Sequence, residues 1–106
     1  MAYYSEIYGK FRTDHKRKFK AVFNKHKLKP KEFEDKYFYY FQFDWCKWYD
    51  SFKDVAAVNS LIVKILEKDE LAGGYLKIGE DNAMEKVGDP DVVDLYSYVK
   101  VEGWKE

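Results

Sequence analysis

The sequence lacks most of the residues from which small proteins build disulfide and metal sites. Its 106 residues include a single cysteine, Cys46, and two histidines. One cysteine excludes an internal disulfide framework and leaves no second thiol for a zinc knuckle. No run of about eighteen apolar residues exists, and the first ten residues lack the apolar centre of a signal peptide. We therefore expect a cytoplasmic protein that has no contact with a membrane and holds no metal or other cofactor.

Motifs for phosphate, calcium and nucleophilic chemistry are also missing. Gly73-Gly74 and Gly79 belong to no glycine-rich phosphate loop, and no protease-like context surrounds Cys46. His15 and His26 fall in a basic segment, where a solvated histidine is far more common than a general base. The acidic residues that follow Gly79 do not match the calcium-binding loop pattern: Glu80, Asp81, Asp89 and Asp91. The sequence therefore predicts a protein that is not an enzyme.

Charge is balanced over the whole chain but unevenly distributed along it. A chain of this length fits one domain, residues 1–106. Residues 1–31 carry ten basic and two acidic side chains, a net +8, and residues 32–65 carry four and six, a net −2. Residues 66–106 carry five and eleven, a net −6. This split gives either two poles that attract oppositely charged partners or two regions that neutralise each other in the fold.

The first third of the chain predicts a strand followed by a basic helix. Residues 2–10 alternate and are rich in β-forming side chains. Thr13 or Asp14 can cap a helix whose core stripe is Phe19, Val22, Phe23 and His26 and which ends near Leu28, before Pro30. Residues 31–34 are expected to form a short turn.

Nine aromatic residues crowd into residues 37–50, YFYYFQFDWCKWYD. Such a run without Gly or Pro favours a central strand, whose side chains alternate between two faces. The odd-numbered face from Tyr37 to Trp45 is wholly aromatic and is the better candidate for the core. The even-numbered face mixes aromatic and polar groups.

The second half predicts a helix and two strands. Ser51 and Asp54 start a helix with the apolar stripe Val55, Val58, Leu61, Ile62, Ile65 and Leu66. Gly73-Gly74 ends that pattern, and residues 75–79 read as a strand with Leu76 and Ile78 inward. The acidic stretch 80–91 is expected to be a loop, and residues 92–101 a last strand.

These elements give the order β-α-β-α-β-β. With two helices only, the simplest arrangement places both on one face of a four-stranded mixed sheet, after a right-handed β-α-β crossover. The predicted fold class is therefore an α+β two-layer sandwich related to ferredoxin-like folds. Its second sheet face would then meet solvent or a partner.

The expected binding site is this second sheet face together with the basic helix. A contiguous exposed aromatic patch usually marks an interaction site, unless the rings pack on one another or a homodimer covers them. Lysines beside aromatic rings also suit single-stranded RNA, although the RNA-recognition strand motif is absent and the acidic last third opposes phosphate. The candidate binding residues are Tyr75, Lys77, Tyr96, Tyr98, Lys100, Phe38, Tyr40, Lys16, Arg17 and Lys20.

Two stretches carry a resemblance to a known group of proteins. At FDWCKWYD (43–50) and IGED (78–81) the chain resembles small proteins encoded by bacteriophages. That resemblance implies a viral accessory protein in a host cell, and studied proteins of that size and origin are commonly inhibitors of host defence, anti-CRISPR proteins among them. It assigns no functional residue. The expected function is thus inhibition of a host protein or ribonucleoprotein complex by binding, and the alternative is a module that binds single-stranded nucleic acid.

Overall fold

The fold is known from a computed structural model, which describes residues 4–49, 51–81 and 83–88, apart from the side chain of Trp45. The predicted last strand, residues 92–101, lies outside the described residues. The described elements, in chain order, are β1 (Ser5–Arg12), the short 3-10 helix η1 (Thr13–His15), α1 (Lys16–Lys25), β2 (Lys31–Glu34), β3 (Phe38–Cys46), α2 (Lys53–Lys68), β4 (Gly73–Gly79) and β5 (Met84–Gly88).

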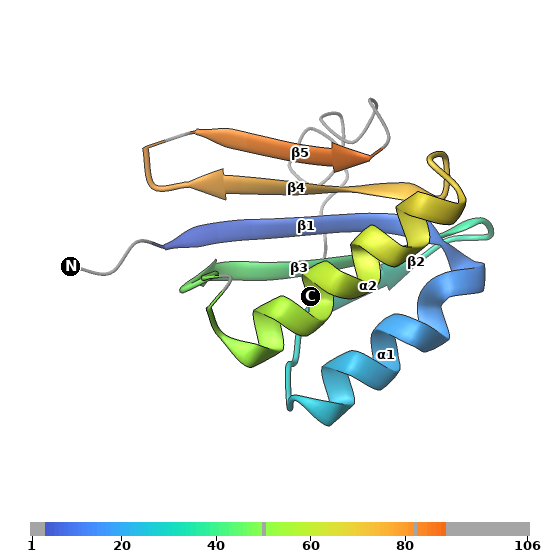
Figure 1. Ribbon diagram of the computed structural model, residues 1–106, viewed down its shortest axis with the longest axis horizontal. Coiled ribbons are helices and arrows are strands. Elements are labelled where there is room, and N and C mark those ends of the chain that lie inside the picture. Colours follow the sequence, from blue (N-terminus) through green and yellow to red (C-terminus); the bar gives the residue numbers. More distant parts are fainter. Residues whose placement is uncertain (1–3, 50, 82, 89–106) are drawn as a thin grey trace.

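The strands form one five-stranded sheet in the order β2-β3-β1-β4-β5, and every neighbouring pair is antiparallel. Both helices lie on the same face of this sheet (Figure 1). Up to β4 the element order is β-α-β-β-α-β, the split arrangement of ferredoxin-like domains, and β5 extends one edge. The predicted α+β class is confirmed, whereas the predicted four-stranded mixed sheet is wrong.

The prediction of a mixed sheet was wrong because the segment that forms β2 was predicted to be a turn. A strand inserted between α1 and β3 reverses the direction of β3, so that β3 runs antiparallel to β1 instead of parallel. The segment Lys31–Glu34 carries three charged side chains and one aromatic ring, and it lies at the sheet edge, where charged residues are tolerated. The loop expected at 80–91 likewise contains β5, whose residues are all exposed.

The core lies between the helices and one face of the sheet. α1 contributes Phe19 and Phe23, which pack in tilted and edge-on contacts with Phe41 of β3 at centroid distances of 5.1 and 5.2 Å. α2 buries the stripe predicted from its spacing: Val55, Val58, Ile62 and Ile65. The odd-numbered face of β3, Tyr39 and Phe41 included, belongs to the same cluster, as the sequence predicted.

The opposite face of the sheet is also buried, although no described helix lies on it. Tyr8, Leu76 and Ile78 alternate with residues of the helix-side core, and their side chains are 1%, 0% and 5% exposed. Tyr40 and Gln42 on the same face are 6% and 7% exposed. The expectation of a sheet face with uncovered rings is therefore wrong for these described strands.

Candidate functional site

The structure divides the described sheet residues of the predicted binding site between two faces. Tyr75 pairs with Gly9, whose other partner is Phe41, so Tyr75 lies on the helix side and is 6% exposed. Lys77 shares that side, since it lies two residues along the same strand. Phe38 and Tyr40 lie on the opposite face. Tyr96, Tyr98 and Lys100 fall outside the described residues.

The placement of Tyr75 has a simple cause. The sequence predicted correctly that Leu76 and Ile78 share a face, but assigned that face to the helices. Because β4 is buried on both sides, its pattern does not say which side faces the helices, and pairing with β1 decides it. The described part of the predicted aromatic patch is thus divided between two faces.

A different cluster forms at the tip of the β2–β3 hairpin. The Asp35 carboxylate accepts hydrogen bonds from the backbone N–H groups of Tyr37 (2.9 Å) and Phe38 (2.7 Å) and from the Tyr40 hydroxyl (3.0 Å). Burial alone would raise the pKa of Asp35, but these hydrogen bonds outweigh it and hold the pKa below its ordinary value. This ordered turn directs Tyr37 outward, and its side chain is 65% exposed.

The hairpin tip borders a cleft of about 400 Å³ where β1 runs into η1. The backbone N–H of Thr13 donates to the carbonyl of Tyr37 at 3.0 Å, which fixes the tip against the start of η1. The ammonium of Lys10 lies 4.4 Å from the centre of the Phe38 ring. The cleft is lined by two cations, one acid, one hydroxyl and two rings: Arg12, Lys36, Asp14, Thr13, Tyr37 and Phe38.

Two cations, Arg12 and Lys36, and the acid Asp14 stand around this cleft. Arg12 is half exposed and makes a loose ion pair of 3.5 Å with Asp69. The ammonium of Lys36 lies 5.4 Å from the centre of the Tyr37 ring. Cations beside an open aromatic ring can hold a phosphate while a flat base stacks on the ring. Sequence reasoning missed this cleft because it placed Tyr37 on the core face of the strand, although Asp35 followed by Lys36 was a turn signal.

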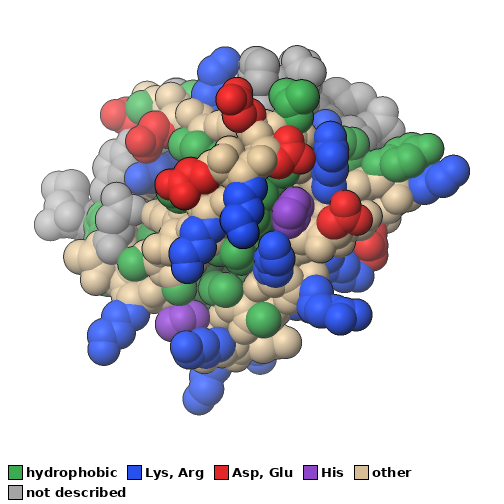
Figure 2. All heavy atoms as spheres, turned by 45° about the vertical axis from the view of Figure 1, so that its right-hand side comes forward, with side chains coloured by type: hydrophobic (Ala, Val, Ile, Leu, Met, Phe, Trp, Pro, Cys, Tyr) green, Lys and Arg blue, Asp and Glu red, His purple; other side chains and the backbone are tan. Residues whose placement is uncertain are grey.

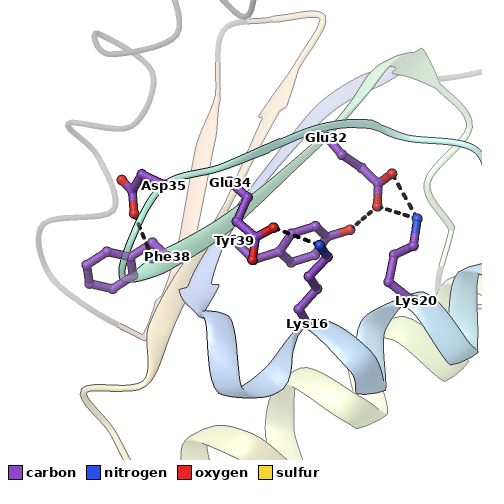
Figure 3. Close-up of polar contacts among 7 residues, drawn as sticks. All are labelled: Lys16, Lys20, Glu32, Glu34, Asp35, Phe38 and Tyr39. Carbon is purple, nitrogen blue, oxygen red and sulfur yellow. Dashed lines mark hydrogen bonds and ion pairs between the residues drawn. The ribbon is translucent and has the colours of Figure 1, made fainter.

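The helix α1 continues the positive surface away from the cleft. Lys16 and Lys20 pair with Glu34 and Glu32 of β2 at 2.7 and 2.9 Å (Figure 3), so two predicted site cations are partly neutralised. Arg17, the third, is exposed and makes no described ion pair. Figure 2 turns this end of the molecule forward and shows Lys and Arg gathered over its lower half, with Asp and Glu mostly above them.

The contact between β2 and α1 is built around a buried phenol. Tyr39, fully buried on the helix side, donates its hydroxyl to Glu32 at 2.5 Å, and Glu32 also accepts from Lys20 (Figure 3). Burial raises the pKa of Tyr39, and the adjacent Glu32 carboxylate raises it further. Burial by itself would raise the pKa of Glu32, but the hydrogen bonds from Tyr39 and Lys20 outweigh it and lower the pKa overall. This network holds α1 against the edge strand.

Two of the residues considered for catalysis, Cys46 and His15, have shifted pKa values. Cys46 is half-buried, its thiol lies 3.6 Å from the carbonyl of Ser5, and burial raises its pKa to about 11. Burial and the neighbouring Lys18 lower the pKa of His15. Within the described part of the chain, no three His, Cys, Asp or Glu side chains gather as a metal site would require. None of the helices described there is long and apolar enough to span a membrane.

Comparison with protein-family models, curated protein sequences and solved structures finds no match to this chain. Its function therefore has to be argued from the cleft and the charged helix. The bacteriophage resemblance stays a prediction.

Proposed function

We propose that the protein binds single-stranded nucleic acid at the hairpin-tip cleft and along the unpaired cations of α1. The observation that carries this proposal is the ring of Tyr37, 65% exposed, beside Arg12 and Lys36 in one cleft. Base stacking on an aromatic side chain contributes about 1–3 kcal/mol per base, and it tolerates any sequence because every base has a flat face. Cations around the ring supply the phosphate contacts.

The distribution of charge on the protein determines the path that a bound nucleic-acid strand would follow. From the cleft, Arg17 and Lys18 lead along the exposed side of α1 toward Lys25. The last third of the chain, residues 66–106, has a net charge of −6 and does not favour contact with phosphates. A nucleic-acid strand that follows α1 therefore meets the most basic part of the chain.

A second candidate is a protein inhibitor of the anti-defence type, binding an acidic host protein through the same pole. Glu32 and Glu34 lie among the cations of α1, and a surface of mixed sign suits a protein interface better than a polyphosphate. Exposed Tyr37 would then serve as the aromatic anchor. Both candidates are non-enzymatic, and they differ in the partner.

Fluorescence anisotropy with a labelled oligonucleotide of about 12 nucleotides tests the proposal, with a duplex of the same length for comparison. We expect tighter binding of the single strand and a steep loss of affinity with salt, about 0.7 log units per log unit of salt for each phosphate contact. Tyr37→Ala should weaken binding at least about fivefold, the equivalent of about 1 kcal/mol. Arg17→Gln should lower the salt slope by about 0.7.

Matched controls come from the far parts of the surface. Tyr4→Ala removes another exposed tyrosine, 39% exposed, and Lys64→Gln removes an exposed cation of α2; neither should change affinity. Absence of single-strand binding at low salt would reject the nucleic-acid proposal. Retention of an acidic host protein that is lost on Tyr37→Ala would instead establish the second candidate.

A further inference from the structure

A second cavity lies on the helix side of the sheet, between α2 and the strands β4 and β5. Its volume is about 170 Å³. Engineered apolar cavities of about 150 Å³ hold benzene, so this one has room for a molecule with a single six-membered ring. The residues that matter for its chemistry are Trp48, Ile62, Tyr75, Lys77, Glu85 and Val87.

Trp48 brings a buried aromatic ring to this cavity. Its side chain is 4% exposed and its ring packs against Phe43 at a centroid distance of 5.1 Å. Among the described residues the indole Nε1–H finds no acceptor. The Nε1 atom is also closed to solvent, so Trp48 contributes part of the cavity wall rather than a hydrogen bond, and its indole N–H signal can report on what fills the cavity.

Lys77 brings a positive charge to the same cavity. It pairs in register with Glu85 of β5, and its ammonium lies 3.7 Å from that carboxylate, a loose contact. The Lys77 side chain is 27% exposed, whereas that of Glu85 is 73% exposed. The lysine is therefore the better sheltered partner, and Glu85 can turn into solvent and leave it to another anion.

We propose that this cavity binds a small monocarboxylic acid with a flat apolar body, of the size of benzoate. The carboxylate replaces Glu85 as the partner of Lys77, and the ring of Trp48 lines the cavity beside it. The apolar body contacts Ile62, Val87 and the ring of Tyr75. This proposal does not depend on the nucleic-acid proposal, because it concerns the opposite side of α2 from the positive pole.

Titration of the ¹⁵N-labelled protein with benzoate tests this proposal, since each tryptophan indole N–H gives its own NMR signal and Trp48→Phe identifies that of Trp48. We expect saturable movement of the Trp48 signal with a Kd on the order of 1 mM, as befits so small a ligand. Neutral benzamide, of the same shape, should bind at least about tenfold more weakly because it offers Lys77 no charge.

Two variants with opposite expected effects separate binding from folding. Lys77→Met should weaken benzoate binding at least about fivefold, whereas Glu85→Gln should tighten it because Lys77 loses its competing partner. Val87→Phe, which narrows the cavity from an exposed edge strand, should abolish binding while the unfolding midpoint is kept. Lys64→Met on α2 is the matched control. An immobile Trp48 signal, or equal binding of benzoate and benzamide, would overturn the proposal.

Discussion

The ring of Phe41 on β3 occupies the place where Gly9 on β1 would carry a side chain. A Cβ built on Gly9 would lie 2.1 Å from Cζ of Phe41, and the two residues are register partners. Phe41 is fully buried between Phe19 and Phe23 of α1, so its ring has no room to move aside. The missing side chain of Gly9 is what allows a phenylalanine at the centre of the core.

We expect Gly9→Ala to reduce the free energy of unfolding by about 1–3 kcal/mol, the usual cost of overpacking a core. Urea unfolding followed by fluorescence measures it. Gly9→Ala should cost less stability in a Phe41→Leu background than in the wild-type protein, because the shorter side chain at position 41 makes room for the methyl group. Purely additive effects would show that the two residues do not compete for this space.

A second prediction follows from the burial of the sheet face opposite the helices. Leu76 on that face is fully buried, and Leu76→Ala should cost about 2–5 kcal/mol of unfolding free energy, as other buried leucines do. Met84→Ala on neighbouring β5 is the control; its side chain is 53% exposed and its removal should change stability by less than about 0.5 kcal/mol. A cost below about 1 kcal/mol for Leu76→Ala would mean that this face is open to solvent.

The helices and the core could be predicted because their signal is local. The spacing of Val55, Val58 and Ile62 allows one buried stripe on α2, and the aromatic odd-numbered face of β3 could only be core. Short edge strands carry no such signal. The segments Lys31–Glu34 and Met84–Gly88 become strands through pairing with β3 and β4, which their own composition does not reveal.

The candidate site was predictable only in its charge. The basic run on α1 was visible in the sequence, and Arg17 is indeed exposed. The cleft depends on the hairpin that brings Tyr37 beside Thr13, a contact between residues 24 positions apart in the chain. Because β2 was not predicted, the sequence analysis placed Tyr37 inside a long central strand, and its exposure could not be predicted.

The hairpin tip should depend on Asp35. Asp35→Ala removes the acceptor for two backbone N–H groups and the Tyr40 hydroxyl, and we expect it to lower the unfolding free energy by about 1–2 kcal/mol. Asp35→Asn keeps one acceptor oxygen and should retain about half of that stability. Chemical denaturation of the three proteins measures this order. Equal stability of the alanine and wild-type proteins would contradict the role of the carboxylate in the turn.

The Glu32 network predicts a specific response to acid. The pKa of Glu32 lies below its ordinary value of 4.5, so the ionised carboxylate stabilises the fold above that pH, and this contribution is lost as the pH falls through the folded-state pKa. Because the Glu32 side chain is 32% exposed and solvent screens its ion pair, the effect should be about 1 kcal/mol or less. Glu32→Gln should therefore flatten the fall in unfolding midpoint below about pH 4.5, whereas Glu67→Gln on α2 should leave it unchanged. An unaltered acid profile in Glu32→Gln would contradict this assignment.

We expect the thiol of Cys46 to react slowly with alkylating reagents. Burial, reinforced by the charges of Asp44 and Asp54, raises its pKa to about 11, and the thiolate is the form that reacts. In the folded protein at about pH 8 we expect iodoacetamide to alkylate Cys46 at least about tenfold more slowly than an exposed cysteine. A matched comparison is Ser51→Cys in the Cys46→Ser background, which places the single thiol on the exposed turn before α2. In denaturant the two thiols should react alike, because the difference arises from the fold. Equal rates in the folded proteins would show that the Cys46 thiol is open to solvent, and its contact with the carbonyl of Ser5 would then not persist in solution.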